Sequence, residues 1–336
     1  MKRDYYWIKA KVANILNDEL LRQEILDAPH KCLSSGVQAR FQPSITSEEL
    51  RKQAEHYDPS NTTPGITEFE SIVLPFGRPV LMVRNNTFDN TAPDFEKPES
   101  TVLRDRLEQA RPFLEKAIPA VGRIEVEEHP TYDWVGTGWL VAEDIVVTNR
   151  HVASVFAQRD GESFKFRRNF GDKTMEGIID FREEFAVDKQ SEFKLIKVLY
   201  IEDEDGPDIA FFRVEKQSEE LSLVPPIKLS EEPVQQRMKV AVIGYPASDS
   251  RVTDPALMRR IFGDVFNVKR LAPGEIMKVE NNSFLHDCST LGGNSGSTVL
   301  DLSTGNAVGL HFAGQFLKGN YAVPANLIAE RLQKLG

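Results

Sequence analysis

The spacing of hydrophobic residues predicts a mostly helical first third of the chain. Apolar side chains recur every three or four positions in residues 5–27, which is the pattern of an amphipathic helix. A second helix is predicted at residues 45–57, where Thr46 or Ser47 can cap the first turn. Three further segments are a short strand at 78–86, a proline-rich linker at 90–100 and a helix at 101–118 kinked near Pro112.

The pattern changes near Ala120. From there, short apolar or alternating runs are separated by glycines and polar turns, which indicates an all-β domain suited to a closed barrel or a sandwich. The tail PANLIAERLQKLG predicts a closing helix that Pro324 begins and Gly336 ends. We therefore expect a regulatory or recruitment region at 1–117 and a β domain at 118–336.

Composition and charge exclude two classes of binding partner. The 336 residues carry a net charge of -10, whereas binding to phosphate groups requires an excess of Lys and Arg. We therefore expect no nucleic-acid partner. No stretch approaches the roughly 18 apolar residues of a membrane span, so no membrane partner is expected either.

Cysteine content and the first residues indicate the compartment. Cys32 and Cys288 are far apart in sequence, so no disulfide framework is predicted and a reducing compartment fits best. Charged residues interrupt the apolar positions of residues 1–20, which is unlike a secretory signal. These features predict a cytoplasmic protein.

The segment STLGGNSGSTVLD, residues 289–301, crowds three glycines around Ser295. Glycine packs no side chain, so Gly292, Gly293 and Gly296 indicate unusual backbone angles or the close approach of another molecule. A serine hydroxyl is a weak nucleophile unless a neighbouring base activates it. The segment therefore predicts a reactive serine if such a base is present.

His151 and Asp208 are the candidate base and orienting group. His151 follows an apolar run in VVTNRHVA, and Asp208 precedes another in EDGPDIAFFRV. Asp203 and Asp205 are alternatives to Asp208, which we favour because the following strand would fix it in the interior. The backbone N–H groups of Gly293 and Ser295 can stabilise the oxyanion that forms when Ser295 attacks a carbonyl.

The order His, Asp, Ser in TNRHVA, DIA and GNSGS resembles the chymotrypsin-fold serine peptidases, in particular their bacterial glutamyl-endopeptidase-like branch. The resemblance covers residues 118–336. It implies a mainly β fold of two six-stranded antiparallel barrels with a C-terminal helix, preceded by a smaller, mostly helical domain. The order also differs from α/β-hydrolases, in which the serine comes first.

The resemblance also implies a specificity pocket. Ser289 lies where trypsin-like enzymes carry the aspartate that selects Arg and Lys, so we expect non-tryptic specificity. Thr290 and His311 lie where glutamyl endopeptidases bind an acidic P1 side chain, and a small or uncharged polar P1 residue is the alternative. His286 either lines the same pocket or is structural.

Three further expectations concern chain cleavage, metal binding and Cys288, and the first of them follows from the resemblance. Asn294 stands where trypsin-like enzymes carry an aspartate that pairs with a newly cut amino terminus, so we expect activity without cleavage of the chain. The histidines His30, His56 and His129 lack any metal-binding spacing, and we expect neither a metal nor a cofactor. Cys288 is expected to be a buried, inert thiol.

Together these observations predict an intracellular serine endopeptidase that cleaves a protein substrate through an acyl-enzyme. Residues 1–117 are expected to gate it or to recruit its substrate through a partner, and the resemblance suits a bacterial defence or signalling role. A catalytically silent binding module is the main alternative, and an esterase is a weaker one.

Overall fold

A computed structural model describes residues 79–90, 98–218, 221–247, 261–315 and 319–335. The chain divides into two compact units, Met1–Glu68 and Phe69–Gly336, and every described residue belongs to the second. The helices predicted at 5–27 and 45–57 lie outside the described residues. Among the described helices, none combines the length and the apolar character needed to cross a membrane.

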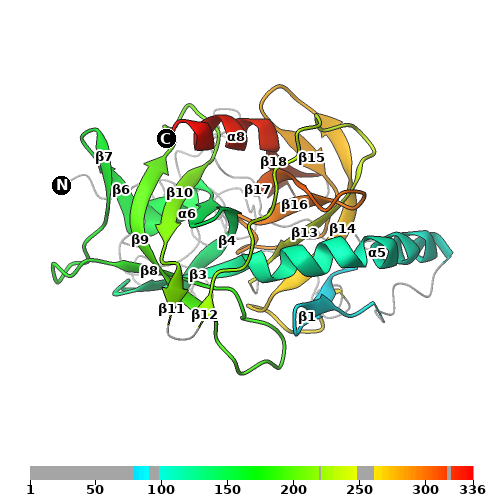
Figure 1. Ribbon diagram of the computed structural model, residues 1–336, viewed down its shortest axis with the longest axis horizontal. Coiled ribbons are helices and arrows are strands. Elements are labelled where there is room, and N and C mark those ends of the chain that lie inside the picture. The colour runs from blue at the N-terminus through cyan, green and yellow to red at the C-terminus, as the bar shows by residue number, and fades with distance from the viewer. Residues whose placement is uncertain (1–78, 91–97, 219–220, 248–260, 316–318, 336) are drawn as a thin grey trace, which may run out of the picture. The chain divides into compact units, whose positions relative to one another are not determined.

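Six antiparallel strands form the first closed barrel, drawn in green in Figure 1. Their order around the barrel is β10-β5-β4-β3-β8-β9. Alternating or continuous apolar residues fill its interior, including the fully buried Trp139, Phe211 and Phe212. The strands are β3 (Val121–Glu127), β4 (Trp134–Ala142), β5 (Ile145–Thr148), β8 (Glu176–Asp180), β9 (Glu192–Ile201) and β10 (Ala210–Val214).

A second barrel, yellow to red in Figure 1, has the order β13-β16-β17-β18-β15-β14 and closes through the pairing of β13 with β14. Its strands are β13 (Lys239–Gly244), β14 (Arg270–Val279), β15 (Phe284–His286), β16 (Thr298–Asp301), β17 (Ala307–Gln315) and β18 (Gly319–Pro324). The helix α8 (Ala325–Gln333) follows β18. The predicted mainly β fold of two barrels with a closing helix is confirmed. Of the two architectures that the sequence left open, a closed barrel and a sandwich, the structure has the barrel.

Short elements connect the barrel strands. The helix α6 (Arg150–Phe156) follows β5 directly, and the hairpin β6 (Ala157–Asp160) and β7 (Ser163–Phe166) follows α6. Phe156 stacks on Phe212 with ring centroids 5.1 Å apart, which fixes α6 against the first barrel. The pair β11 (Gln217–Ser218) and β12 (Leu221–Ser222) lies between the two barrels in sequence.

Residues before 118 also pack on the barrels. The strand β1 (Leu81–Arg84) pairs with β14, and β2 (Thr87–Phe88) pairs with β1. The helix α5 (Pro98–Ala117) continues through Pro112 and reaches β3 through the short 3-10 helix η3 (Ile118–Ala120). Leu107 and Leu114 of α5 are completely buried in the cluster that contains the first-barrel core. The predicted boundary near 118 thus falls inside one compact unit, and a separate role for residues 1–117 stays a prediction.

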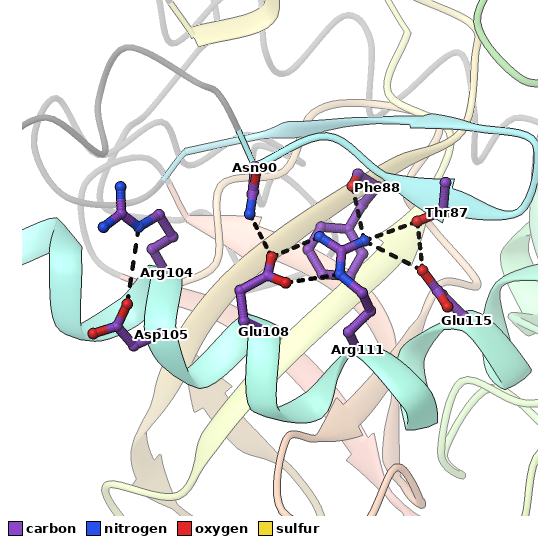
Figure 2. A network of polar contacts seen from close by, with 8 residues as sticks. All are labelled: Thr87, Phe88, Asn90, Arg104, Asp105, Glu108, Arg111 and Glu115. Atoms are coloured by element: carbon purple, nitrogen blue, oxygen red, sulfur yellow. Dashed lines mark hydrogen bonds and ion pairs between the residues drawn. The ribbon is translucent and has the colours of Figure 1, made fainter.

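Arg111 connects α5 to the β1–β2 hairpin, as Figure 2 shows. Its guanidinium binds Glu108 and Glu115 on its own helix, donates to Thr87 Oγ1 at 2.8 Å and lies 3.9 Å above the Phe88 ring. Asn90 also bonds to Glu108. The hairpin and the helix are therefore joined by charged hydrogen bonds as well as by apolar packing.

A buried lysine just before β14 of the second barrel binds the 3-10 helix η3 and the segment that follows β8 of the first barrel. Lys269, just before β14, donates from Nζ to Ile118 O at 3.0 Å and to Phe181 O at 2.8 Å. Its Nζ also lies 3.6 Å from Glu184 Oε1, and both side chains are fully buried. Burial lowers the pKa of Lys269 to about 8, against the opposing charge of Glu184.

Candidate active site

The pairing of β5 with β10 brings His151 and Asp208 together. Ala210 lies opposite Thr148 in this ladder, so the residues just after β5 and just before β10 lie at the same end of it. Asn149, between β5 and α6, donates from Nδ2 to Asp208 O at 3.0 Å. His151 lies in the first turn of α6.

Both carboxylate oxygens of Asp208 bind the same histidine. Oδ1 accepts the backbone N–H of His151 at 3.0 Å, and Oδ2 lies 2.5 Å from ring Nδ1. Of the alternatives, Asp203 pairs with Arg159 at the surface and Asp205 is exposed. Of the three candidate aspartates, the structure thus brings Asp208 to His151.

The Asp208 carboxyl is held in its charged form. Burial alone raises its pKa, but the charge of His151 and the hydrogen bonds from that residue outweigh burial, so the pKa lies below its ordinary value. The Asp208 side chain is 12% exposed, whereas that of His151 is 35% exposed. A negative charge is thus buried behind a histidine ring that solvent can reach.

Ser295 completes the row of three side chains. Its Oγ lies 2.8 Å from His151 Nε2 and 3.4 Å from Phe312 O on β17. Phe312 is the extra residue of an irregularity in the pairing of β17 with β18, between His311 and Ala313. The site lies between the barrels, because His151 and Asp208 come from the first and Ser295 from the second.

The glycines around Ser295 allow a close approach of backbone to backbone. Gly293 and Gly296 have φ of +89° and +87°, which side chains rarely adopt. A Cβ on Gly296 would lie 1.9 Å from Thr137 O, and a Cβ on Gly293 would lie 2.5 Å from Tyr245 O. The loop therefore requires glycine at both positions.

Hydrogen bonds fix the peptides of this loop. Ala247 N donates to Gly292 O at 2.6 Å, and Ser297 N donates to Asn294 O at 2.8 Å. In a trans peptide the N–H points away from the carbonyl. Binding these two carbonyls therefore directs the N–H groups of the following residues, Gly293 and Ser295, toward the opposite side of the loop.

The side chain of Asn294 is held by hydrogen bonds to nearby residues of the same loop. Its Nδ2 donates to Leu291 O at 3.1 Å, and its Oδ1 lies 3.4 Å from Ser297 Oγ. The contacts described for this neutral side chain are short-range contacts within the loop. The conformation of the loop therefore does not depend on a charge at position 294.

The predicted specificity residues are all buried. Ser289 is 2% exposed, and Thr290 and His311 are completely buried. Thr290 Oγ1 has no hydrogen-bond partner among the described residues. The structure thus buries all three residues, and the backbone of His311 is hydrogen-bonded to Gly296 and Ser297.

His286 is the partner of His311. Its Nε2 lies 3.3 Å from His311 Nδ1, and the two rings meet edge to face with centroids 5.3 Å apart. Burial, and secondarily the charge of His311, holds the pKa of His286 well below its ordinary value. His286 is therefore neutral and can accept a hydrogen bond from His311.

One group of carboxylates lies outside this site. Oxygens of Glu125, Asp180 and Glu183 lie within 4.8 Å of one another, which is close enough to hold a metal ion. Arg123 already forms ion pairs with Glu125 and Glu183. Because a guanidinium neutralises much of this charge, the group is an ion-pair network at the edge of the first barrel.

Sequence reasoning missed Thr137. This residue of β4 bonds to the loop on both sides of Asn294, through its backbone to Ser295 and through its side chain to Gly293. The only signal in the sequence is its place between Gly136 and Gly138, which indicates close backbone approach in a strand. The partner that approaches lies 156 residues away along the chain.

Comparisons with known proteins agree with this geometry. The profile of the trypsin-like peptidase domain matches residues 136–310, a range that includes His151, Asp208 and Ser295. A probable serine protease of Lysobacter enzymogenes is 30% identical over 245 residues, and the match covers 65% of this chain and 62% of that protein. The chain thus spans less than two thirds of the length of this relative.

Two solved structures match about two thirds of this chain. The inactive form of the Rv3671c protease from M. tuberculosis is 19% identical, covers 68% of this chain and 96% of that one, and has a TM-score of 0.42. The serine endoprotease from Yersinia pestis is 17% identical, covers 68% of this chain and 65% of that one, and has a TM-score of 0.43. Since the family profile matches just over half of the residues, the chain belongs to the family of trypsin-like peptidase domains.

Proposed function

We propose that the protein is a serine endopeptidase in which Ser295 is the nucleophile, His151 the general base and Asp208 the orienting group. The observation that carries the proposal is the position of the His151 ring, which lies 2.5 Å from Asp208 Oδ2 and 2.8 Å from Ser295 Oγ. A charged carboxylate at Nδ1 keeps the proton there, so Nε2 is the nitrogen that accepts the Ser295 proton.

The reaction follows from these contacts. Ser295 Oγ attacks the carbonyl carbon of a peptide bond while His151 Nε2 takes its proton, and Asp208 stabilises the resulting imidazolium. The N–H groups of Gly293 and Ser295 bind the oxyanion of the tetrahedral intermediate. His151 then protonates the leaving amine, and a water molecule that His151 activates hydrolyses the acyl-enzyme.

Replacement of the nucleophile tests this proposal. Ser295→Ala removes the attacking oxygen and leaves the barrels intact, so we expect cleavage of an unfolded protein substrate to fall at least about 1,000-fold. Ser163→Ala, in the exposed β6–β7 hairpin, is the matched control and should cleave at the wild-type rate. New peptide termini counted by mass spectrometry measure both rates, and equal cleavage by Ser295→Ala would refute the mechanism.

We infer that the enzyme prefers Glu or Asp at P1, as in the glutamyl-endopeptidase-like branch, and that it is not tryptic. The Thr290 hydroxyl, which has no hydrogen-bond partner in the described part of the chain, supports this preference. So does the position of His311 beside His286, because a histidine can donate a charge-assisted hydrogen bond to a carboxylate. Profiling on a peptide library tests it: no enrichment of acidic P1 residues would end the idea, and His311→Asn should abolish any enrichment found.

We propose that the chain acts without proteolytic processing, in the cytoplasm, with residues 1–117 as the part that gates it or recruits a partner. The local hydrogen bonds of Asn294 support activity in the uncut chain. The two cysteines in 336 residues suit a reducing compartment. Cell fractionation tests the location, and recovery of the protein only outside the cytoplasm would contradict it.

A further inference from the structure

A buried threonine of the first barrel holds the loop that carries Ser295 in the second. Thr137 lies in β4 and is completely buried. Its backbone N donates to Ser295 O at 2.8 Å, and its Oγ1 lies 2.9 Å from Gly293 O. One residue therefore binds two carbonyls of the loop, one on each side of Asn294.

Chemistry fixes the direction of the side-chain bond. The backbone N of Tyr245, just after β13, lies 3.2 Å from Thr137 Oγ1 and can only donate. The Gly293 carbonyl can only accept. The hydroxyl of Thr137 has a single proton, so it accepts from Tyr245 and donates to Gly293.

The bond from Thr137 Oγ1 to Gly293 O acts on the 293–294 peptide. This peptide lies between the two peptides whose N–H groups form the oxyanion hole. The 292–293 peptide is held through Gly292 O and the 294–295 peptide through Asn294 O. The 293–294 peptide between them is held at its carbonyl by Thr137 Oγ1 and at its N–H by Leu291 O, to which Asn294 N donates at 3.1 Å. Gly293 has φ of +89° and no side chain, so sterics restrict its torsions little, and the bond from Thr137 to Gly293 O helps to fix the angle between the two peptides that meet at Gly293. Loss of that bond lets the torsions of Gly293 change, and with them the direction of the Gly293 N–H relative to the Ser295 N–H.

Thr137 also connects the loop to the strand that precedes His151. Its backbone O accepts from Thr148 Oγ1 at 2.7 Å, and Thr148 is the last residue of β5. The nucleophile loop and the strand before the base are thus bound to the same residue. The bond from Thr148 is buried and the bond to Gly293 is partly buried, and a buried hydrogen bond cannot be replaced by solvent without a cost.

We propose that Thr137 is a positioning residue that keeps the oxyanion hole formed before substrate arrives, through the bond from its hydroxyl to Gly293 O. This inference rests on the proposed function. Thr137 touches no reacting atom and acts through Gly293. In the present chain this neutral clamp, together with the local bonds of Asn294, holds the loop in the uncut protein.

Labelling by a fluorophosphonate tests the clamp, because the phosphonyl oxygen of the probe occupies the oxyanion hole while Ser295 attacks phosphorus. Thr137→Val keeps the shape of the side chain and removes its donor. We expect the second-order labelling rate of the full chain to fall about 10- to 100-fold, less than the 100- to 1,000-fold typical for loss of a hole donor itself. Thr137→Ser keeps the hydroxyl and should retain most of the wild-type rate.

The control is the same substitution at another buried threonine. Thr298, in β16, is completely buried, and its hydroxyl has no hydrogen-bond partner within the described part of the chain. Thr298→Val should therefore label at the wild-type rate. The pH midpoint of labelling should be the same in Thr137→Val as in the wild type, because His151 and Asp208 are untouched, while the plateau rate is lower.

The labelling results separate failure of the clamp from failure of the proposed serine chemistry. If Thr137→Val folds and labels as fast as the wild type, the clamp is refuted. If it does not fold, Thr137→Cys, with a weaker donor, must label more slowly than Thr137→Ser, and equal rates refute the clamp. A folded wild-type chain that is never labelled refutes the serine chemistry itself, and the clamp with it.

Discussion

At the scale of single residues, Asp208 determines which nitrogen of His151 faces Ser295. Both of its oxygens bind that residue, one through the ring and one through the backbone. A carboxylate placed in this way fixes the ring in one orientation and one tautomer. The geometry that we propose for catalysis is therefore already present before any substrate binds.

The buried pair of His286 and His311 makes stability depend on pH. The pKa of His286 is well below its ordinary value in the folded protein, whereas the unfolded chain takes up a proton near pH 6.5. Below that pH the unfolded state binds more protons, so the free energy of unfolding falls as pH falls, by up to about 1.4 kcal/mol per pH unit.

His286→Gln removes this titration while keeping a neutral polar group at the position. Urea unfolding of the wild type and the variant at pH 7.0, 6.0 and 5.0 measures the effect. We expect the stability of the variant to fall less steeply with acid than that of the wild type. Parallel curves would show that His286 is protonated in the folded state.

The motifs TNRHVA, DIA and GNSGS predicted the three side chains that the structure brings together, because each is a local signal at a strand edge. The role of Thr137 was not predictable in the same way. A threonine between two glycines is an ordinary strand residue until its partner, Gly293, is known, and that partner belongs to the other barrel.

At the scale of elements, the β1–β2 hairpin and α5 form a single attachment to the second barrel and the core. The sequence predicted a strand at 78–86 and a helix at 101–118, since each pattern is local. It did not predict that β1 pairs with β14, because Leu81 and Leu271 are far apart along the chain. Periodicity identifies an apolar face but not the surface that covers it.

Arg111→Met should loosen this attachment. The substitution keeps an unbranched apolar stem but removes the guanidinium, and with it the hydrogen bonds to Thr87 and the Phe88 carbonyl. The Arg111 side chain is only 25% exposed, so we expect a loss of about 1–2 kcal/mol in the free energy of unfolding, as for hydrogen bonds to a charged group.

The same helix supplies the control. Arg104 is 43% exposed, and its Nε lies 3.9 Å from Asp105, as Figure 2 shows beside the Arg111 network. Arg104→Met should therefore change the free energy of unfolding by less than about 0.5 kcal/mol. Unfolding of both variants in guanidinium chloride measures the difference. Equal losses in the free energy of unfolding would show that the Arg111 network does not stabilise the fold.

At the scale of the whole molecule, the two barrels and the described residues from 79 onward belong to one compact unit. The sequence indicated the β domain through its short alternating runs, yet it placed the boundary at 118, where the composition changes. Packing places no break there: Leu81, Leu107 and Leu114 are each at most 1% exposed in the common core. A change in secondary structure is therefore not a domain boundary in this chain.

Truncation should show the same result. A chain of residues 69–336 is the whole second compact unit and keeps these side chains, so it should unfold cooperatively. A chain of 118–336 loses three buried leucines, worth about 5–9 kcal/mol, which is comparable to the whole stability of a typical domain. Calorimetry should give no cooperative transition for the shorter chain, and an unchanged midpoint would show that the N-terminal elements are only loosely attached.

The central claim is that an uncut chain carries one activated serine, Ser295. The most direct measurement is the intact mass of the full chain after reaction with a fluorophosphonate, followed by peptide mapping of the adduct. We predict the mass of the complete chain plus one adduct, located on Ser295 and absent from His151→Ala. An adduct on another residue, or one found only on chains cut before residue 118, would contradict the account.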